Sequence, residues 1–75
     1  MIVSADRDAS GQASELLATS PVAELRRLQV SQRAGRLKIS GRVGSFYHKQ
    51  LAQETVRSVA VGLRLINEID VEHRR

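Results

Sequence analysis

This chain of 75 residues lacks several residue types, and each absence excludes a class of function. There is no cysteine, so neither a disulfide nor a thiolate metal site can form, and two histidines are too few for most zinc sites. There is no tryptophan, and only Phe46 and Tyr47 are aromatic, so a stacking platform for bases or sugars is not expected. We therefore predict no metal, no cofactor and no nucleic-acid partner.

The chain also lacks a long apolar stretch. No segment approaches the roughly 20 apolar residues that span a membrane. The first ten residues, MIVSADRDAS, are acidic and contain no apolar core of signal-peptide length. As the sequence stands we expect a cytoplasmic protein, whereas a trimmed N-terminus would allow a periplasmic or membrane-peripheral one. The length allows one small domain, which buries only about 60% of its unfolded surface.

Positive charge is in excess, and it is concentrated in the middle of the chain. Twelve Lys and Arg residues against eight Asp and Glu residues give a net charge of +4. Residues 26–49 carry seven basic residues and no acidic one, residues 1–25 are acidic overall, and residues 50–75 are balanced. Such a surplus is typical of proteins that bind polyanions.

The first segment with helical spacing lies near the N-terminus. Apolar residues at positions 13, 16 and 17 predict a short helix over 11–19, with Ser10 as its N-cap. Pro21 ends this helix, because the residue before a proline avoids the helical region. Pro21 could also open a further helical turn, although we expect a loop over 20–25.

A second helix is expected over residues 46–60. Ser45 is a suitable N-cap, and the buried stripe of the helix includes Ala52 and Val56. Gly62 fits the position just after the helix, where a left-handed backbone costs little only for glycine.

Three segments alternate between apolar and polar residues, as strands with one buried face do. Two of them flank Ala34-Gly35 and predict a β-hairpin, and the third covers residues 64–72. The second helix connects the last two strands, which should therefore run parallel. We predict an α+β two-layer sandwich in the order α-β-β-α-β, with a three-stranded mixed sheet and both helices on one face. We expect residues 1–10 to be a flexible segment, 11–72 the single domain and 73–75 a tail.

Two motifs within this order resemble a known family. Residues 37–43 read LKISGRV, an apolar-x-apolar-x-Gly pattern, and residues 62–71 read GLRLINEIDV, a glycine followed by alternating apolar residues around an asparagine. In this order and spacing they resemble the BON domain (bacterial osmotic-stress and nodulation domain), over about residues 14–72. The resemblance implies binding without catalysis, to phospholipid or to a protein partner.

The face of the sheet without helices carries most of the basic block. Such side chains can attract anionic lipid headgroups. Alternatively the face is merely solvated, because Glu68, Asp70 and Glu72 point the same way and would pair with the bases if the third strand lies beside the second. The candidate contacts with an anionic surface are Arg27, Arg33, Arg36, Lys38, Arg42 and Lys49.

Phe46, Tyr47 and His48 open the second helix and form a candidate docking site for a membrane interface or a partner. The alternative is that Phe46 or Tyr47 packs under the first helix and His48 is simply exposed. The sequence places no carboxylate or serine to make His48 a catalytic base, so we predict no catalytic residue and no enzyme activity.

Four residues have expected structural roles. Gly35 supports the hairpin turn, and Gly41 lets a helix approach the sheet closely. Asn67 falls on the apolar side of the third strand, where its amide needs partners, which we expect in the backbone near Gly62. A bulge at residues 65–66 would instead turn Asn67 outward.

Two functions from different classes fit these observations. The first is a non-catalytic module that attaches to anionic phospholipid or membrane surfaces. The alternative is protein-protein interaction or self-association without lipid binding, in which the edge of the third strand receives another chain. The oligomeric state is left open.

Overall fold

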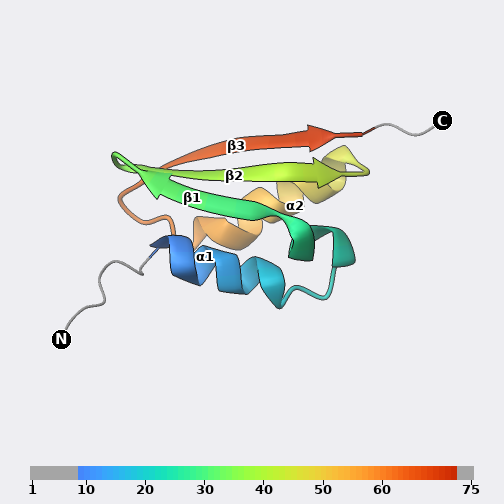
Figure 1. The fold of residues 1–75 in the computed structure, drawn as a ribbon, viewed down its shortest axis with the longest axis horizontal. Coiled ribbons are helices and arrows are strands. Elements are labelled where there is room, and N and C mark those ends of the chain that lie inside the picture. Colours follow the sequence, from blue (N-terminus) through green and yellow to red (C-terminus); the bar gives the residue numbers. More distant parts are fainter. Residues whose placement is uncertain (1–8, 73–75) are drawn as a thin grey trace.

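Residues 9–72 are described by a computed structural model, in which the helices lie against a sheet of strands (Figure 1). The expected tail 73–75 and most of the expected flexible segment 1–10 lie outside the described residues. The elements are α1 (Ala9–Ala18), the 3-10 helix η2 (Ala23–Arg27), β1 (Gln29–Arg33), β2 (Arg36–Val43), α2 (Phe46–Arg57) and β3 (Arg64–Val71).

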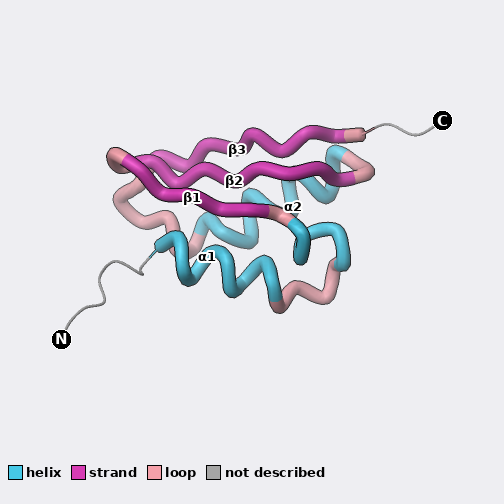
Figure 2. Tube along the Cα trace, viewed as in Figure 1, coloured by secondary structure: helices cyan, strands magenta, loops and turns pink. Residues whose placement is uncertain are grey.

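The strands form one mixed sheet in the order β1-β2-β3. β1 pairs with β2 in antiparallel fashion, and β2 pairs with β3 in parallel. Figures 1 and 2 show α1 and α2 on the same side of this sheet, so within residues 9–72 the other face has no helix on it. The predicted α+β two-layer sandwich is therefore confirmed, including the crossover through α2.

The predicted hairpin turn is confirmed at Ala34-Gly35. Both residues have positive φ, 50° at Ala34 and 78° at Gly35. Two consecutive residues of this kind form the turn whose twist matches that of an antiparallel ribbon. The short turn fixes the register of the hairpin, so Arg33 pairs directly with Arg36.

The core lies between the helices and the inner face of the sheet. Leu37 and Ile39 of β2 are completely buried, as are Ala52 and Val56 of α2. This follows from the alternation of β2, whose odd-numbered residues face inward, and from the helical spacing of α2. The remaining buried apolar residues are Ala13, Leu17, Leu25, Leu28, Val43, Ala60 and Ile69.

Two expectations for the N-terminal part of the domain are wrong. Helix α1 begins at Ala9, so Ser10 lies inside the helix and is not its N-cap; its backbone N–H donates to Oε1 of Gln32. Part of the expected loop forms η2, because Leu25 has an apolar site to fill in the core.

Helix α2 begins as predicted but ends earlier. The hydroxyl of Ser45 accepts a hydrogen bond from the backbone N–H of His48, which confirms the N-cap. The helix stops at Arg57 instead of residue 60, and Ser58 is its C-cap. Gly62 has the expected positive φ of 79°, but it lies in the turn that leads into β3 and not directly after the helix.

Gly41 lies against Leu28 and not against a helix as expected. Its φ is 132°, and a Cβ atom at this position would lie 2.7 Å from Cδ2 of Leu28. The glycine therefore makes room for the residue that precedes β1 and not for a helix. Both the backbone conformation and the packing of buried Leu28 depend on the missing side chain.

We expect Gly41→Ala to lower the free energy of unfolding by about 1–3 kcal/mol, because the alanine is strained and displaces Leu28. Urea denaturation followed by circular dichroism measures the loss. Gly35→Asn is the matched control, since that position is open and asparagine tolerates a positive φ, and it should lose less than about 1 kcal/mol. Equal losses in the two variants would contradict the role of Leu28.

Candidate functional site

The register of the sheet brings three arginines into one row on the open face. Arg33 of β1 pairs with Arg36 of β2, and Arg36 pairs with Arg64 of β3. All three are exposed, and in the part of the chain that the structure describes none forms an ion pair. Like charges directly opposite one another destabilise a sheet. We call these three residues the arginine row.

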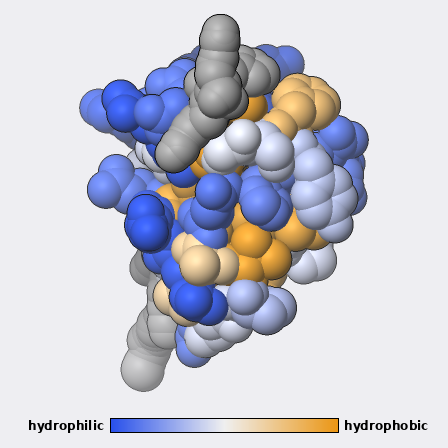
Figure 3. Space-filling view, turned by 90° about the vertical axis from the view of Figure 1, so that its right-hand side faces the viewer, coloured by the Kyte–Doolittle hydropathy of each residue, from blue (hydrophilic) through white to orange (hydrophobic). Residues whose placement is uncertain are grey.

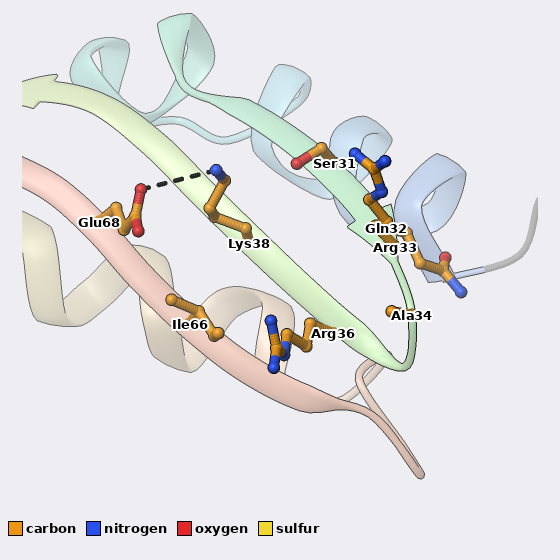
Figure 4. Close-up of a pocket in the computed structure, with 8 residues that line it drawn as sticks. All are labelled: Ser31, Gln32, Arg33, Ala34, Arg36, Lys38, Ile66 and Glu68. Carbon is orange, nitrogen blue, oxygen red and sulfur yellow. Dashed lines mark ion pairs between the residues drawn. The ribbon is translucent and has the colours of Figure 1, made fainter.

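A shallow depression of about 530 Å³ lies beside the arginine row (Figure 4). Lys38 and Glu68 lie across it, with Nζ of Lys38 3.7 Å from Oε1 of Glu68. Ile66, which pairs with Lys38 in register, contributes apolar surface between the charged groups. The residues that line the depression are Ser31, Gln32, Arg33, Ala34, Arg36, Lys38, Ile66 and Glu68.

The expected pairing with acidic residues of β3 occurs in part. Because β3 lies beside β2, Lys38 meets Glu68 as anticipated. Arg42 faces Asp70 in register, but no ion pair within 4 Å joins these two described residues. At the hairpin end, therefore, Glu68 faces Lys38, whereas the register partner of Arg36 is another arginine, Arg64.

The six predicted basic contacts do not form one patch. Arg33, Arg36 and Lys38 lie together at the hairpin end of the face. Arg27 and Arg42 line a second depression of about 450 Å³ at the other end, together with Glu24, Glu72, Val43 and Gly44. Lys49 is half-buried on α2, away from the open face.

Arg64 is a site residue that the sequence analysis missed. It begins β3 and pairs with Arg36, which lies 28 positions earlier in the chain. The signal that could have found it is the predicted parallel crossover, combined with the equal lengths of β2 and β3, eight residues each. Without the register between β2 and β3, the sequence does not place Arg64 beside Arg36.

The aromatic residues lie at the opposite end from the arginine row. Phe46 and Tyr47 begin α2 and are 64% and 68% exposed. The interpretation in which one of them packs under the first helix is therefore wrong. Figure 3, which views this end of the molecule, shows apolar surface among hydrophilic groups.

His48 has a carboxylate partner, contrary to expectation. Its Nδ1 lies 2.8 Å from Oε1 of Glu24, which also accepts a hydrogen bond from the backbone N–H of Gly44 at 2.8 Å. The bond from Gly44, followed by the one from His48, lowers the pKa of Glu24. The sequence did not reveal this pair because Glu24 is 24 residues away, in a segment expected to be loop. These contacts link η2 to the N-terminal end of α2.

Asn67 faces inward, as alternation predicts, and binds α2. Its Nδ2 donates to the carbonyl of Lys49 and to Oε1 of Gln53, both at 3.1 Å, while its Oδ1 accepts from the backbone N–H of Ile69. The expected partners near Gly62 are wrong, because β3 runs alongside α2 at this point and the helix is closer. Asn67 therefore has a structural role.

Two further findings concern residues 9–72. No helix of this range is long and apolar enough to cross a membrane. No group of three His, Asp or Glu side chains in this range is arranged to hold a metal ion.

We expect acid to weaken the fold through Glu24. Since its pKa is lower in the folded chain, the carboxylate stabilises the fold above its ordinary pKa of about 4.5, and this contribution disappears as the pH falls through the lower, folded value. Urea unfolding measured at a series of pH values should therefore show less pH dependence in Glu24→Gln. Glu15→Gln, a change at an exposed position on α1, is the control and should behave like the unmodified protein. An unchanged pH profile in Glu24→Gln would refute the assignment.

No family model matches the chain, and no curated protein matches it. The resemblance to the BON domain stays a prediction.

Proposed function

We propose that this domain is a non-catalytic binding module that attaches to anionic phospholipid surfaces through the hairpin end of its open sheet face. The observation that carries the proposal is the arginine row, Arg33, Arg36 and Arg64, with Lys38 beside it. The row lies on the face that no helix covers, so a flat surface can approach it (Figure 1).

The chemistry of these side chains suits phosphate groups. A guanidinium group donates in a planar fork that matches phosphate oxygens and is more weakly hydrated than an ammonium group. Near an anionic membrane each such charge contributes about 1 kcal/mol, and salt screens the attraction. Nucleic acid is less suited, because the aromatic side chains that could stack on bases lie at the far end of the sheet.

The electrostatic repulsion within the arginine row supports the same proposal. Three like charges in adjacent register positions oppose sheet formation, and exposed positions accept many other residues. A local arrangement that works against stability is typical of a functional surface.

We expect Arg33→Gln/Arg36→Gln to weaken binding to vesicles of phosphatidylglycerol and phosphatidylcholine. Two charges at about 1 kcal/mol each correspond to roughly 30-fold in the partition coefficient. Co-sedimentation at low and high salt measures the change, and neutral phosphatidylcholine vesicles should bind neither protein. Arg64 is left unchanged in this variant.

Arg27→Gln/Arg42→Gln is the matched control. It removes the same charge from the opposite end of the sheet, where Glu24 and Glu72 are close. We expect it to retain most of the binding. If both variants lose binding equally, only the net charge matters and the arginine row is not the site; if the unmodified protein does not bind anionic vesicles at low salt, the proposed function is wrong.

A second function, protein-protein interaction, is favoured by the exposed aromatic pair. Phe46 and Tyr47 are adjacent and mostly exposed, although aromatic residues usually bury much of their surface. Bases and acids are mixed around this end of the sheet, so long-range attraction to a polyanion is weak there. Exposed aromatic residues are enriched in the centres of protein interfaces.

We expect Phe46→Ser/Tyr47→Ser to change the free energy of unfolding by less than about 0.5 kcal/mol, because both side chains are mainly in solvent. A photo-crosslinking residue in place of Tyr47 should give a discrete product in cells, and Phe46→Ser should abolish it. The same residue in place of Glu54, which is exposed further along α2, serves as the control. A large loss of stability, or equal products from both positions, would count against an interface here.

A further inference from the structure

We propose that the free edge of β3 pairs with β3 of a second copy of this chain, antiparallel and centred on Ile66, so that two three-stranded sheets join into one. This pairing goes beyond attachment to lipid, since it involves the backbone edge of β3 and a different partner, although it shares Arg64 with the arginine row. Three features support it: the backbone groups that reach the edge, the protective devices that the edge lacks, and the self-complementary sequence of β3.

Backbone hydrogen bonds identify the groups that face the free edge. The N–H of Arg64 donates to the carbonyl of Gly35 at 2.9 Å, and that of Glu72 donates to Val43 at 2.8 Å. In a parallel ladder alternate residues direct both polar groups to the same neighbour, so the even-numbered residues of β3 face β2. The odd-numbered ones, Leu65, Asn67, Ile69 and Val71, direct these groups to the free edge.

Most of the backbone groups at the free edge have no partner within residues 9–72. The exception is the N–H of Ile69, which donates to Oδ1 of Asn67 at 3.1 Å. The N–H groups of Leu65, Asn67 and Val71 form no hydrogen bond with any described residue. Together with the carbonyls they are a template for another strand.

The edge of β3 also lacks several of the features that usually protect an edge. Over Arg64–Val71 there is no proline, glycine or lysine, and the register with β2 is continuous without a bulge. The opposite edge strand, β1, has only five residues, and its Gln32 side chain binds the start of α1. Of the two edges, β3 is therefore the longer and the less obstructed.

The sequence of β3 is complementary to itself in one antiparallel register. With Ile66 opposite Ile66 of the second copy, Arg64 of each chain lies opposite Glu68 of the other. These side chains are all on the open face. The centre is an apolar contact flanked by two pairs of opposite charge, and such pairs stabilise neighbouring strands. Leu65 then forms backbone hydrogen bonds with Asn67 of the second copy. These bonds do not use the N–H of Ile69, which already donates to Asn67 of its own chain.

Neighbouring registers fit less well. A pairing centred on Glu68 opposes two carboxylates, and one centred on Arg64 opposes two guanidinium groups. A pairing centred on Asn67 sets Ile66 against Glu68 and requires the N–H of Ile69, which Asn67 already binds. Charge, apolar contact and backbone geometry thus favour the register centred on Ile66 over these three.

A charge exchange tests the register. Sedimentation velocity over a range of concentrations should show a monomer–dimer equilibrium for the unmodified chain. Arg64→Glu and Glu68→Arg should each shift it toward monomer, since each places like charges opposite one another, and the double variant Arg64→Glu/Glu68→Arg should restore the dimer. In the register centred on Asn67 the double variant would set the introduced carboxylate at position 64 against Asp70 and restore nothing.

Cysteine cross-linking gives a second measurement that needs no change in charge. The chain has no cysteine, so Ile66→Cys introduces a single thiol. Facing residues of this kind lie about 4.5 Å apart, within the span of a disulfide. Ile66→Cys should oxidise to a linked dimer about tenfold or more faster than Glu68→Cys on the same strand or Ser31→Cys on β1.

Three results would overturn the proposal: a strictly monomeric unmodified chain at millimolar concentration, a charge-exchanged double variant that stays monomeric, or equal rates of cross-linking at positions 66 and 68. Vesicle binding is tested separately on Arg33 and Arg36, which lie outside the pairing, whereas Arg64 of the arginine row takes part in it. The Arg33→Gln/Arg36→Gln variant should dimerise normally, which keeps the two proposals separable.

Discussion

The pairing of β2 with a strand on each side is the constraint on which the rest of this structure depends. β2 supplies the two completely buried residues at the middle of the sheet, Leu37 and Ile39. Its inner face is fixed by the core, so its even-numbered residues must face outward. A shift of one residue would bury Arg36 and Lys38, and the cost of burying unpaired charge forbids it. Core packing therefore also fixes the position of the basic side chains.

Alternation in the sequence was sufficient to predict the sheet and the sides of its residues. The pattern around Ala34-Gly35 predicted the hairpin, and the pattern over 64–72 predicted a strand with Asn67 inside. What alternation cannot supply is the register between strands that are distant in sequence. The arginine row was missed for that reason, because Arg64 joins Arg36 only through a crossover of known length.

Contacts between irregular segments were the least predictable part. Glu24 reaches His48 and Gly44 from a segment with no periodic pattern, and η2 forms because Leu25 fits the core rather than because of local propensity. The end of α2 was also misplaced, since Val59 and Ala60 keep the apolar spacing of a helix while packing from a turn. In each case tertiary packing overrides the local signal.

The carboxylate of Glu24 has a consequence for ligand selection. Helix N-termini are common sites for phosphate, because their free N–H groups and the helix dipole attract anions. Here the hydroxyl of Ser45 accepts the N–H of His48 in the first turn of α2, and Glu24 accepts the N–H of Gly44 just before the helix, so side chains of the domain occupy two of the donors at this end. A phosphate at this end would have to compete with an intramolecular carboxylate. In the proposed function an anionic surface is therefore met by exposed guanidinium groups of the sheet and not by the start of a helix.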